Sequence, residues 1–158
     1  MVLASSYLVD TNILLRLARA ADPHYKLVSD AFHILDDRGA EFYFSLQNIV
    51  ELWNVCTRPA AKNGFGLGTV DTIARIEAIE LHMTLLPDNE EVYESWKRIV
   101  ATCDVKGVQV HDARLAAIME VHGVRNILTL NQDDFKRYTQ IAAVHPAEIL
   151  KFSENPKF

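Results

Sequence analysis

The sequence predicts an α/β fold with a central, mainly parallel sheet flanked by helices. Short apolar segments alternate with segments of helical periodicity, and the segment NILTL at 126–130 is mostly apolar, which suits a strand buried in a parallel sheet. The 158 residues, 49% hydrophobic and 23% charged, fit one folded domain. We expect this domain to span residues 1–152, with a frayed tail at 153–158.

In the first half of the chain, apolar residues that recur every three or four positions predict helices, and short apolar runs between them predict strands. The predicted elements are strand 6–9, helix 11–19, helix 24–37, strand 41–46 and helix 47–57. Gly39 follows the second helix as a stop signal. Pro59 ends the third helix because its ring cannot continue the hydrogen-bond ladder.

The second half of the chain starts from a loop at 63–68, where the sequence NGFGLG is rich in glycine. The elements predicted after it are helix 69–81, strand 83–86, helix 89–102, helix 112–121, strand 126–130, a short helix at 133–138 and strand 141–144. Thr69 is placed to cap its helix, and Gly123 to be a left-handed residue at a helix C-terminus. The last strand is expected to close the domain before Pro146.

Charge and composition exclude several classes of protein. The net charge of −5 and the pI near 5.6 argue against coating nucleic acid through a broad basic surface, but not against gripping a few phosphates through metal ions. No stretch approaches the roughly 20 apolar residues of a membrane span, and the N-terminus lacks the features of a signal peptide. Cys56 and Cys103 form no paired framework, so we expect free thiols in a cytoplasmic protein.

Polar residues gather where predicted strands end, which is the edge at which parallel α/β sheets bind ligands. Asp10 ends the first strand, and Glu51 lies one turn into the helix that follows the second strand. Asp112 opens a late helix. The remaining candidates follow strand 126–130 and are Asn131, Asp133 and Asp134. Singly, the aspartates could be helix caps and Glu51 a solvated helix residue. Together, converging carboxylates repel one another unless cations neutralise them, and their hard oxygen donors suit Mg²⁺ or Mn²⁺.

Other chemistries lack their sequence patterns. There is no calcium loop of the form D-x-[DN]-x-[DN]-G, no HExxH, and no cysteine near a histidine in a zinc-ligand spacing. A phosphatase-like domain needs a DxD nucleophile or a P-loop, and Asp10-Thr11-Asn12 lacks the second aspartate. The histidines are expected at the surface or satisfied in the core, with His111 of interest because it adjoins Asp112.

Four segments resemble the PIN-domain nucleases: YLVDTNILL at 7–15, QNIVELWNV at 47–55, GVQVHDARLAAIMEVHGVRNILTLN at 107–131 and DDFKRY at 133–138. The resemblance covers nearly the whole chain in the right order, and it includes the toxin ribonucleases of bacterial toxin–antitoxin pairs. It implies a parallel sheet flanked by helices, one or two Mg²⁺ or Mn²⁺ ions, and cleavage of RNA.

Residue by residue, the resemblance implies three catalytic acids that also ligate the metal: Asp10, Glu51 and Asp112. Asn12 and Thr129 match positions that support the site and its substrate. Asn131 is the expected fourth ligand, although many members have an acid there. Asp133 and Asp134 compete for this role and rank below Asn131, since one can cap a helix and the other precedes an expected core residue.

A mechanism of metal-assisted hydrolysis follows from these roles. A metal ion held by Asp10 and Asp112 would activate a water and stabilise the charge that grows on the phosphate, while Glu51 ligates or orients that water. We expect RNA to approach over a local basic rim despite the acidic total. The rim candidates are Arg58, Lys62, Arg114, Lys136 and Arg137, of which Arg114 and Lys136 are the expected substrate-binding residues.

The resemblance also concerns partners. It implies an antitoxin protein as a possible partner and a homodimer. The alternative to an endoribonuclease is a PIN-like module that holds RNA or a protein without cutting, and the three intact acids argue against this alternative.

Overall fold

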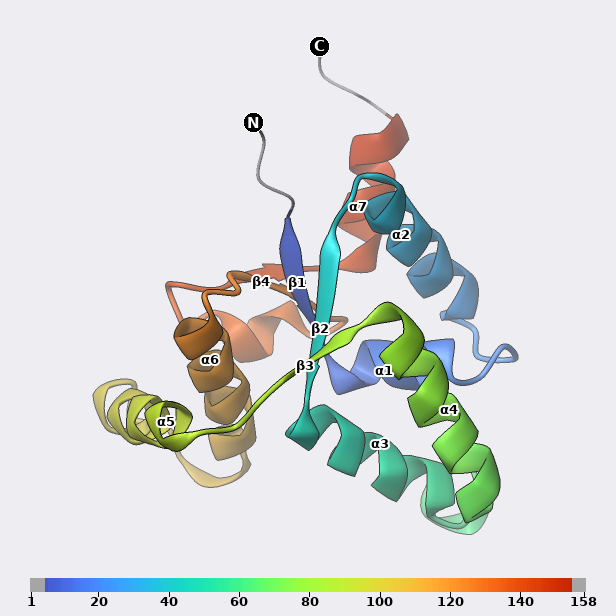
Figure 1. The fold of residues 1–158 in the computed structure, drawn as a ribbon, viewed down its shortest axis with the longest axis horizontal. Helices are drawn as coiled ribbons and strands as arrows, with labels where there is room; N and C mark the ends of the chain where they lie inside the picture. The colour runs from blue at the N-terminus through green and yellow to red at the C-terminus, as the bar shows by residue number, and fades with distance from the viewer. Residues whose placement is uncertain (1–4, 155–158) are drawn as a thin grey trace.

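The strands form one sheet that passes through the middle of the molecule (Figure 1). The computed structural model describes residues 5–154. In spatial order the strands are β3 (Thr84–Leu86), β2 (Glu41–Ser45), β1 (Ser6–Val9), β4 (Asn126–Leu128) and β5 (Ala142–Val144). Every strand pair in the described part of the chain is parallel, which confirms the predicted sheet.

Helices cover both faces of the sheet (Figure 1). They are α1 (Thr11–Leu17), α2 (Tyr25–Asp37), α3 (Leu46–Thr57), α4 (Thr69–His82), α5 (Glu90–Thr102), α6 (Val110–His122) and α7 (Pro146–Glu154). One core layer packs α5 and α6 against Leu8 and Ile127, and the other packs α1, α2, α3 and α7 against Tyr7 and Val9. No helix within residues 5–154 combines the length and apolar character needed to cross a bilayer.

The sheet register brings the ends of the two central strands together. Val9 pairs with Leu128 between β1 and β4. Asp10 and Thr129 are the next residue in each chain segment, so they leave neighbouring strands at the same end of the sheet. The Asp10 backbone N–H donates to the Leu128 carbonyl at 3.0 Å and extends the pairing by one residue. The residues that leave these strands therefore share one edge.

Most element boundaries agree with the sequence prediction to within two residues, and four local predictions are decided by the structure. Gly123 is a left-handed residue with φ 69°, as predicted. Thr69 is wrong as a cap, because Gly68 occupies the cap position and Thr69 is the first helical residue. Helix α6 starts at Val110, so Asp112 lies within its first turn instead of opening it. The short helix expected at 133–138 is a 3₁₀ turn at Gln132–Phe135.

The prediction that the domain closes before Pro146 is wrong, because Pro146 is the first residue of α7. A proline at this position needs no N–H partner, and its fixed φ suits the first turn of a helix. Helix α7 packs against α2 and buries Ile149. Ser153 and Glu154, the first residues of the expected tail, are helical, and residues 155–158 lie outside the described range.

Candidate active site

Asp10 joins β1 to α1 and has both carboxylate oxygens in hydrogen bonds. It is the N-terminal cap of α1, and its Oδ1 accepts from the Thr11 backbone N–H at 2.7 Å. Its Oδ2 accepts from the Thr129 hydroxyl at 2.7 Å and from Asn12 Nδ2 at 3.0 Å. The capping explanation is therefore correct, but it accounts for only one of the two oxygens. The other is held by residues from two separate elements.

Thr129 and Asn12 also order the loop that follows β4. Thr129 is fully buried, and its hydroxyl oxygen accepts from Asn12 Nδ2 at 3.2 Å and from the Asn131 N–H at 3.0 Å. The Asn12 side-chain oxygen accepts from the Leu130 N–H at 3.2 Å. These contacts fix the orientation of the Asp10 carboxylate relative to the next strand, so both residues support the acid directly.

Glu51 is held by two neutral donors, one from α1 and one from its own helix, α3. Its Oε2 accepts from the Thr11 hydroxyl at 2.8 Å, and its Oε1 accepts from Gln47 Nε2 at 2.9 Å. Thr11 in turn accepts from the Asn48 side-chain amide at 3.1 Å, and Asn48 forms a capping box with Ser45 at the start of α3. Glu51 is therefore fixed in place rather than solvated freely.

Burial and the charges of neighbouring carboxylates together raise the pKa of two acids of the site. Burial, with smaller contributions from the charges of Glu51 and Asp134, raises the pKa of Asp10 to about 6, although the hydrogen bond from Thr129 opposes the rise. Burial also raises the pKa of Asp112 to about 6, and among the neighbouring carboxylates Asp134 contributes most. The four carboxylates thus lie close enough to repel one another, as the sequence predicts for Asp10, Glu51 and Asp112.

The loop after β4 contributes an acid that sequence analysis ranked low. The negative charge of Asp134 raises the pKa of both Asp10 and Asp112. Asn131 is exposed, and its backbone N–H rather than its side chain bonds to Thr129. The observed conformation therefore favours Asp134 as the fourth acid of the site, and metal ligation by Asn131 stays a prediction.

These acids fit a hard divalent cation by their chemistry. Within residues 5–154, no lysine or arginine forms an ion pair with Asp10, Glu51, Asp112 or Asp134. Oxygen donors with uncompensated negative charge are what Mg²⁺ and Mn²⁺ require. In the observed conformation, no three carboxylate, imidazole or thiol groups of the described residues could hold one ion together. Ligation by three acids therefore requires a side chain to rotate, and the exposed Asp134 has room to do so.

Three of the five predicted basic residues have partners in this structure. Arg114 donates to Asp88 at 2.7 Å, and Lys136 lies 2.5 Å from Asp133. Arg58 follows α3 and donates to the Asn63 carbonyl at 3.0 Å, closing its own loop. Binding of RNA by Arg114 and Lys136 stays a prediction, and it requires each to exchange its present partner for a phosphate.

Sequence analysis missed four residues of the hydrogen-bond network around the acids: Thr11, Ser45, Gln47 and Asn48. A signal for one of them was available. Gln47 precedes Glu51 by four positions, so both lie on one face of α3. A buried amide beside a carboxylate on the same helix face indicates a positioned acid, not a solvated one.

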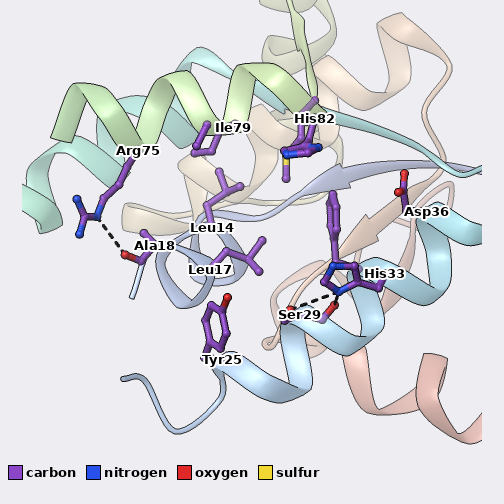
Figure 2. A pocket seen from close by; sticks show the side chains of 13 residues that line it. Leu14, Leu17, Ala18, Tyr25, Ser29, His33, Asp36, Arg75, Ile79 and His82 are labelled. Carbon is purple, nitrogen blue, oxygen red and sulfur yellow. Dashed lines mark hydrogen bonds between the residues drawn. The ribbon is translucent and has the colours of Figure 1, made fainter. Parts of the chain in front are cut away.

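A second feature is an apolar pocket between α1, α2 and α4 (Figure 2). It has a volume of about 360 Å³, and Leu14, Leu17, Tyr25 and Ile79 line it. None of the acids of the candidate site lines it. Arg75 and Ala18 also line it, and Arg75 Nε donates to the Ala18 carbonyl at 3.0 Å. The pocket is therefore a surface feature distinct from the acidic edge.

The fold and site define an α/β domain with an acidic site at the carboxyl edge of a parallel sheet. The sequence model of the PIN domain matches residues 7–141. The chain therefore belongs to the PIN-domain family, as its motifs indicated. No curated protein sequence matches it.

Solved structures with the same fold include several toxin–antitoxin assemblies. VapBC2 from Rickettsia felis, bound to a promoter DNA fragment, gives a TM-score of 0.68 at 12% identity over 89% of this chain and 98% of that one. A toxin–antitoxin complex from Klebsiella pneumoniae gives 0.61 at 19% identity over 89% and 97%. VapC20 from Mycobacterium tuberculosis, a toxin that cleaves the sarcin-ricin loop, gives 0.54 at 18% identity over 78% and 87%. The chain thus shares the fold of PIN toxins.

Proposed function

We propose that this protein is an endoribonuclease that depends on Mg²⁺ or Mn²⁺ and hydrolyses phosphodiester bonds in RNA. The observation that carries the proposal is the group of mutually repelling acids, with Asp10 and Asp112 both raised in pKa and no basic residue of the described chain paired with them. Membership of the PIN family supports nuclease activity. The cleaving activity named for VapC20 supports RNA as the substrate.

Each acid has a role in this proposal. Asp10 and Asp112 would hold the ion, with Asp134 or Asn131 as a further ligand, and a bound Mg²⁺ or Mn²⁺ supplies an acidified water and neutralises phosphate charge. Glu51 would orient that water or add a ligand. Its two hydrogen bonds, from Thr11 and Gln47, fix its direction before substrate binds. Positioned groups of this kind contribute to catalysis because they need no reorganisation during the reaction.

The test is cleavage of labelled RNA by purified protein with Mg²⁺, with Mn²⁺ and with EDTA. Asp10→Asn should keep the fold and lose cleavage, because it removes the charge at the centre of the site. Asp30→Asn is the control, since Asp30 is a partly exposed acid on α2 that pairs with Lys26. If the wild type cuts no RNA under any metal condition, the chain is a PIN-like module that binds without cutting. Equal cleavage by wild type and Asp10→Asn would remove Asp10 from the site.

The proposed function includes a protein partner, an antitoxin, on the apolar pocket of Figure 2. The toxin–antitoxin neighbours support such a partner, and apolar side chains from three helices line the pocket, among them Leu14, Tyr25 and Ile79. An exposed apolar patch of this kind is typical of a protein contact. Ala78 is exposed and lines the pocket, so Ala78→Arg should block it with little effect on the fold. Co-purification with the protein encoded by an adjacent gene tests this, with Ala101→Arg on α5 as control.

A homodimer is the remaining partner that we propose. Leu46 and Val50 are one turn apart on α3 and 52% and 58% exposed, which offers apolar contact next to Glu51. Val50→Lys should then shift the protein toward a monomer in light scattering, and an unchanged mass would remove this face from the interface.

A further inference from the structure

Gln47 connects two segments that carry acids of the candidate site. It is the second residue of α3 and is only 6% exposed. Its side-chain Nε2 donates to Glu51 Oε1 at 2.9 Å and to the backbone carbonyl of His111 at 3.0 Å. His111 directly precedes Asp112 in the first turn of α6. One amide group therefore ties Glu51 to the segment that holds Asp112.

The two contacts determine which way the amide faces. Both partners, a carboxylate oxygen and a carbonyl oxygen, are acceptors, so the NH₂ group must face them and uses both of its hydrogens. The amide oxygen of Gln47 is then buried without a hydrogen-bond donor among the described residues. A buried acceptor without a donor destabilises a fold, so such an atom needs an explanation.

The surroundings of Gln47 limit what can donate to its oxygen. The neighbouring carboxylate of Glu51 and the carbonyl of His111 have no hydrogen to give. The oxygen has essentially no accessible surface, so there is no room for a water beside it in the observed conformation. The two bonds of the NH₂ group therefore hold Glu51 to the start of α6 although they leave this oxygen without a donor.

The choice of an amide also matters for the charge of the site. Within residues 5–154, the side chains that donate to Asp10 and Glu51 are all neutral: Thr11, Asn12, Gln47 and Thr129. A lysine or arginine in any of these places would orient the acids equally well but would cancel the charge that attracts a cation. Neutral donors fix the direction of the acids and leave their charge available.

We propose that Gln47 is a positioning residue of this site, which sets the spacing of Glu51 and Asp112 through its two hydrogen bonds. The proposal rests on the proposed function, because it assigns Gln47 a role toward the divalent ion. Without the amide, Glu51 loses one of its two donors and α3 loses its bond to the start of α6. Loss of a supporting contact of this kind costs roughly 10-fold to 100-fold in metal affinity.

The experiment measures Mn²⁺ binding by titration calorimetry at pH 7 for wild type, Gln47→Met and Gln47→Asn. Methionine keeps the side-chain length and removes the amide, while asparagine keeps an amide that is too short to reach both partners. Gln132→Met is the matched control: Gln132 Nε2 also donates to a glutamate, Glu148 at 3.0 Å, and to a carbonyl, that of Ala143 at 2.8 Å. Metal-free unfolding midpoints measure the purely structural cost of each variant.

The expected result is a loss of Mn²⁺ affinity of roughly 10-fold to 100-fold in Gln47→Met and Gln47→Asn, with Gln132→Met within about 2-fold of wild type. Similar drops in the unfolding midpoint for Gln47→Met and Gln132→Met would show that the affinity loss is not a loss of stability. Unchanged affinity in both Gln47 variants overturns the inference, and so does an equal loss in Gln132→Met. Asp10→Asn in the same titration separates the two proposals. If it abolishes binding while the Gln47 variants bind normally, only the inference about Gln47 fails, and if the wild type binds no Mn²⁺, both fail.

Discussion

Glu120 and Asp10 are both acids that accept hydrogen bonds, and the fold treats them in opposite ways. Glu120 on α6 accepts from the Ser95 hydroxyl at 2.8 Å and pairs with Arg98 at 2.5 Å. Burial raises its pKa, but the bonds from Ser95 and Arg98 outweigh burial and hold that pKa below its ordinary value. Asp10 receives only neutral donors, and its pKa rises to about 6. Two things differ: burial raises the pKa of Asp10 most, and Glu120 pairs with the Arg98 guanidinium whereas no lysine or arginine of the described residues pairs with the acids of the site.

The largest expected effect separates these two acids by function. Asp10→Asn should lower the rate of RNA cleavage by roughly 1000-fold, since a metal ion contributes several kcal/mol to such a reaction and each 1.4 kcal/mol is about tenfold. Glu120→Gln should keep the rate within about 2-fold and lower the free energy of unfolding by up to about 1 kcal/mol, as for other partly exposed ion pairs. Cleavage assays and denaturant unfolding on both variants measure this. Comparable activity losses in the two variants would break the comparison.

Removing a neutral donor from Asp10 tests whether orientation matters as well as charge. Thr129→Val keeps the shape of a fully buried side chain and removes the hydroxyl that donates to Asp10. We expect activity to fall by roughly 10-fold to 100-fold, as for other contacts that support a metal ligand. The matched change at the structural acid, Ser95→Ala, should leave activity unchanged. Steady-state cleavage kinetics for both variants decide the matter, and full activity in Thr129→Val would show that Asp10 needs no such support.

Two residues of the β4 loop provide a finer comparison. The charge of Asp134 raises the pKa of Asp10 and of Asp112, whereas the Asn131 side chain forms no hydrogen bond with either acid in the described structure. We therefore expect Asp134→Asn to lower activity by about 10-fold or more. Asn131→Ala should lower it less. The reverse order in cleavage kinetics at limiting Mg²⁺ would restore Asn131 as the fourth ligand.

Much of the fold and the positions of three acids could be predicted from sequence, because hydrophobic periodicity and strand ends are local patterns. Asp10 and Asp112 could be proposed since polar residues that leave parallel strands meet at one edge. The role of Gln47 could not be predicted from sequence, because it depends on a hydrogen bond to the His111 carbonyl, 64 positions along the chain. Asp134 was ranked below Asn131 because it precedes Phe135, which is indeed buried, and sequence alone does not show that the 3₁₀ turn brings Asp134 close to Asp10 and Asp112. Helix α7 was missed because proline can begin a helix as readily as end one.

The raised pKa values predict how stability changes with pH in the metal-free protein. Asp10 and Asp112 have a pKa of about 6 when folded, against an ordinary aspartate value of 3.8, so between these pH values the folded state binds more protons than the unfolded state. Stability therefore falls as the pH rises from about 4 to about 6. Asp10→Asn should flatten this fall, and Glu120→Gln should not. Thermal unfolding in EDTA across this pH range measures it, and a fall of the same size in Asp10→Asn would contradict the assignment of the pKa to Asp10.

The most direct measurement is the shift in unfolding midpoint that Mn²⁺ causes at pH 7 and at pH 4.5 in wild type and Asp10→Asn. At about 100 times the dissociation constant, binding to the folded state alone should raise the wild-type midpoint by roughly 5 to 10 °C. At pH 4.5 the shift should nearly vanish, because protons occupy Asp10 and Asp112 below their pKa of about 6. In Asp10→Asn it should be small at both pH values. An equal shift in both proteins, or no shift in the wild type at pH 7, would contradict a divalent-ion site at these acids.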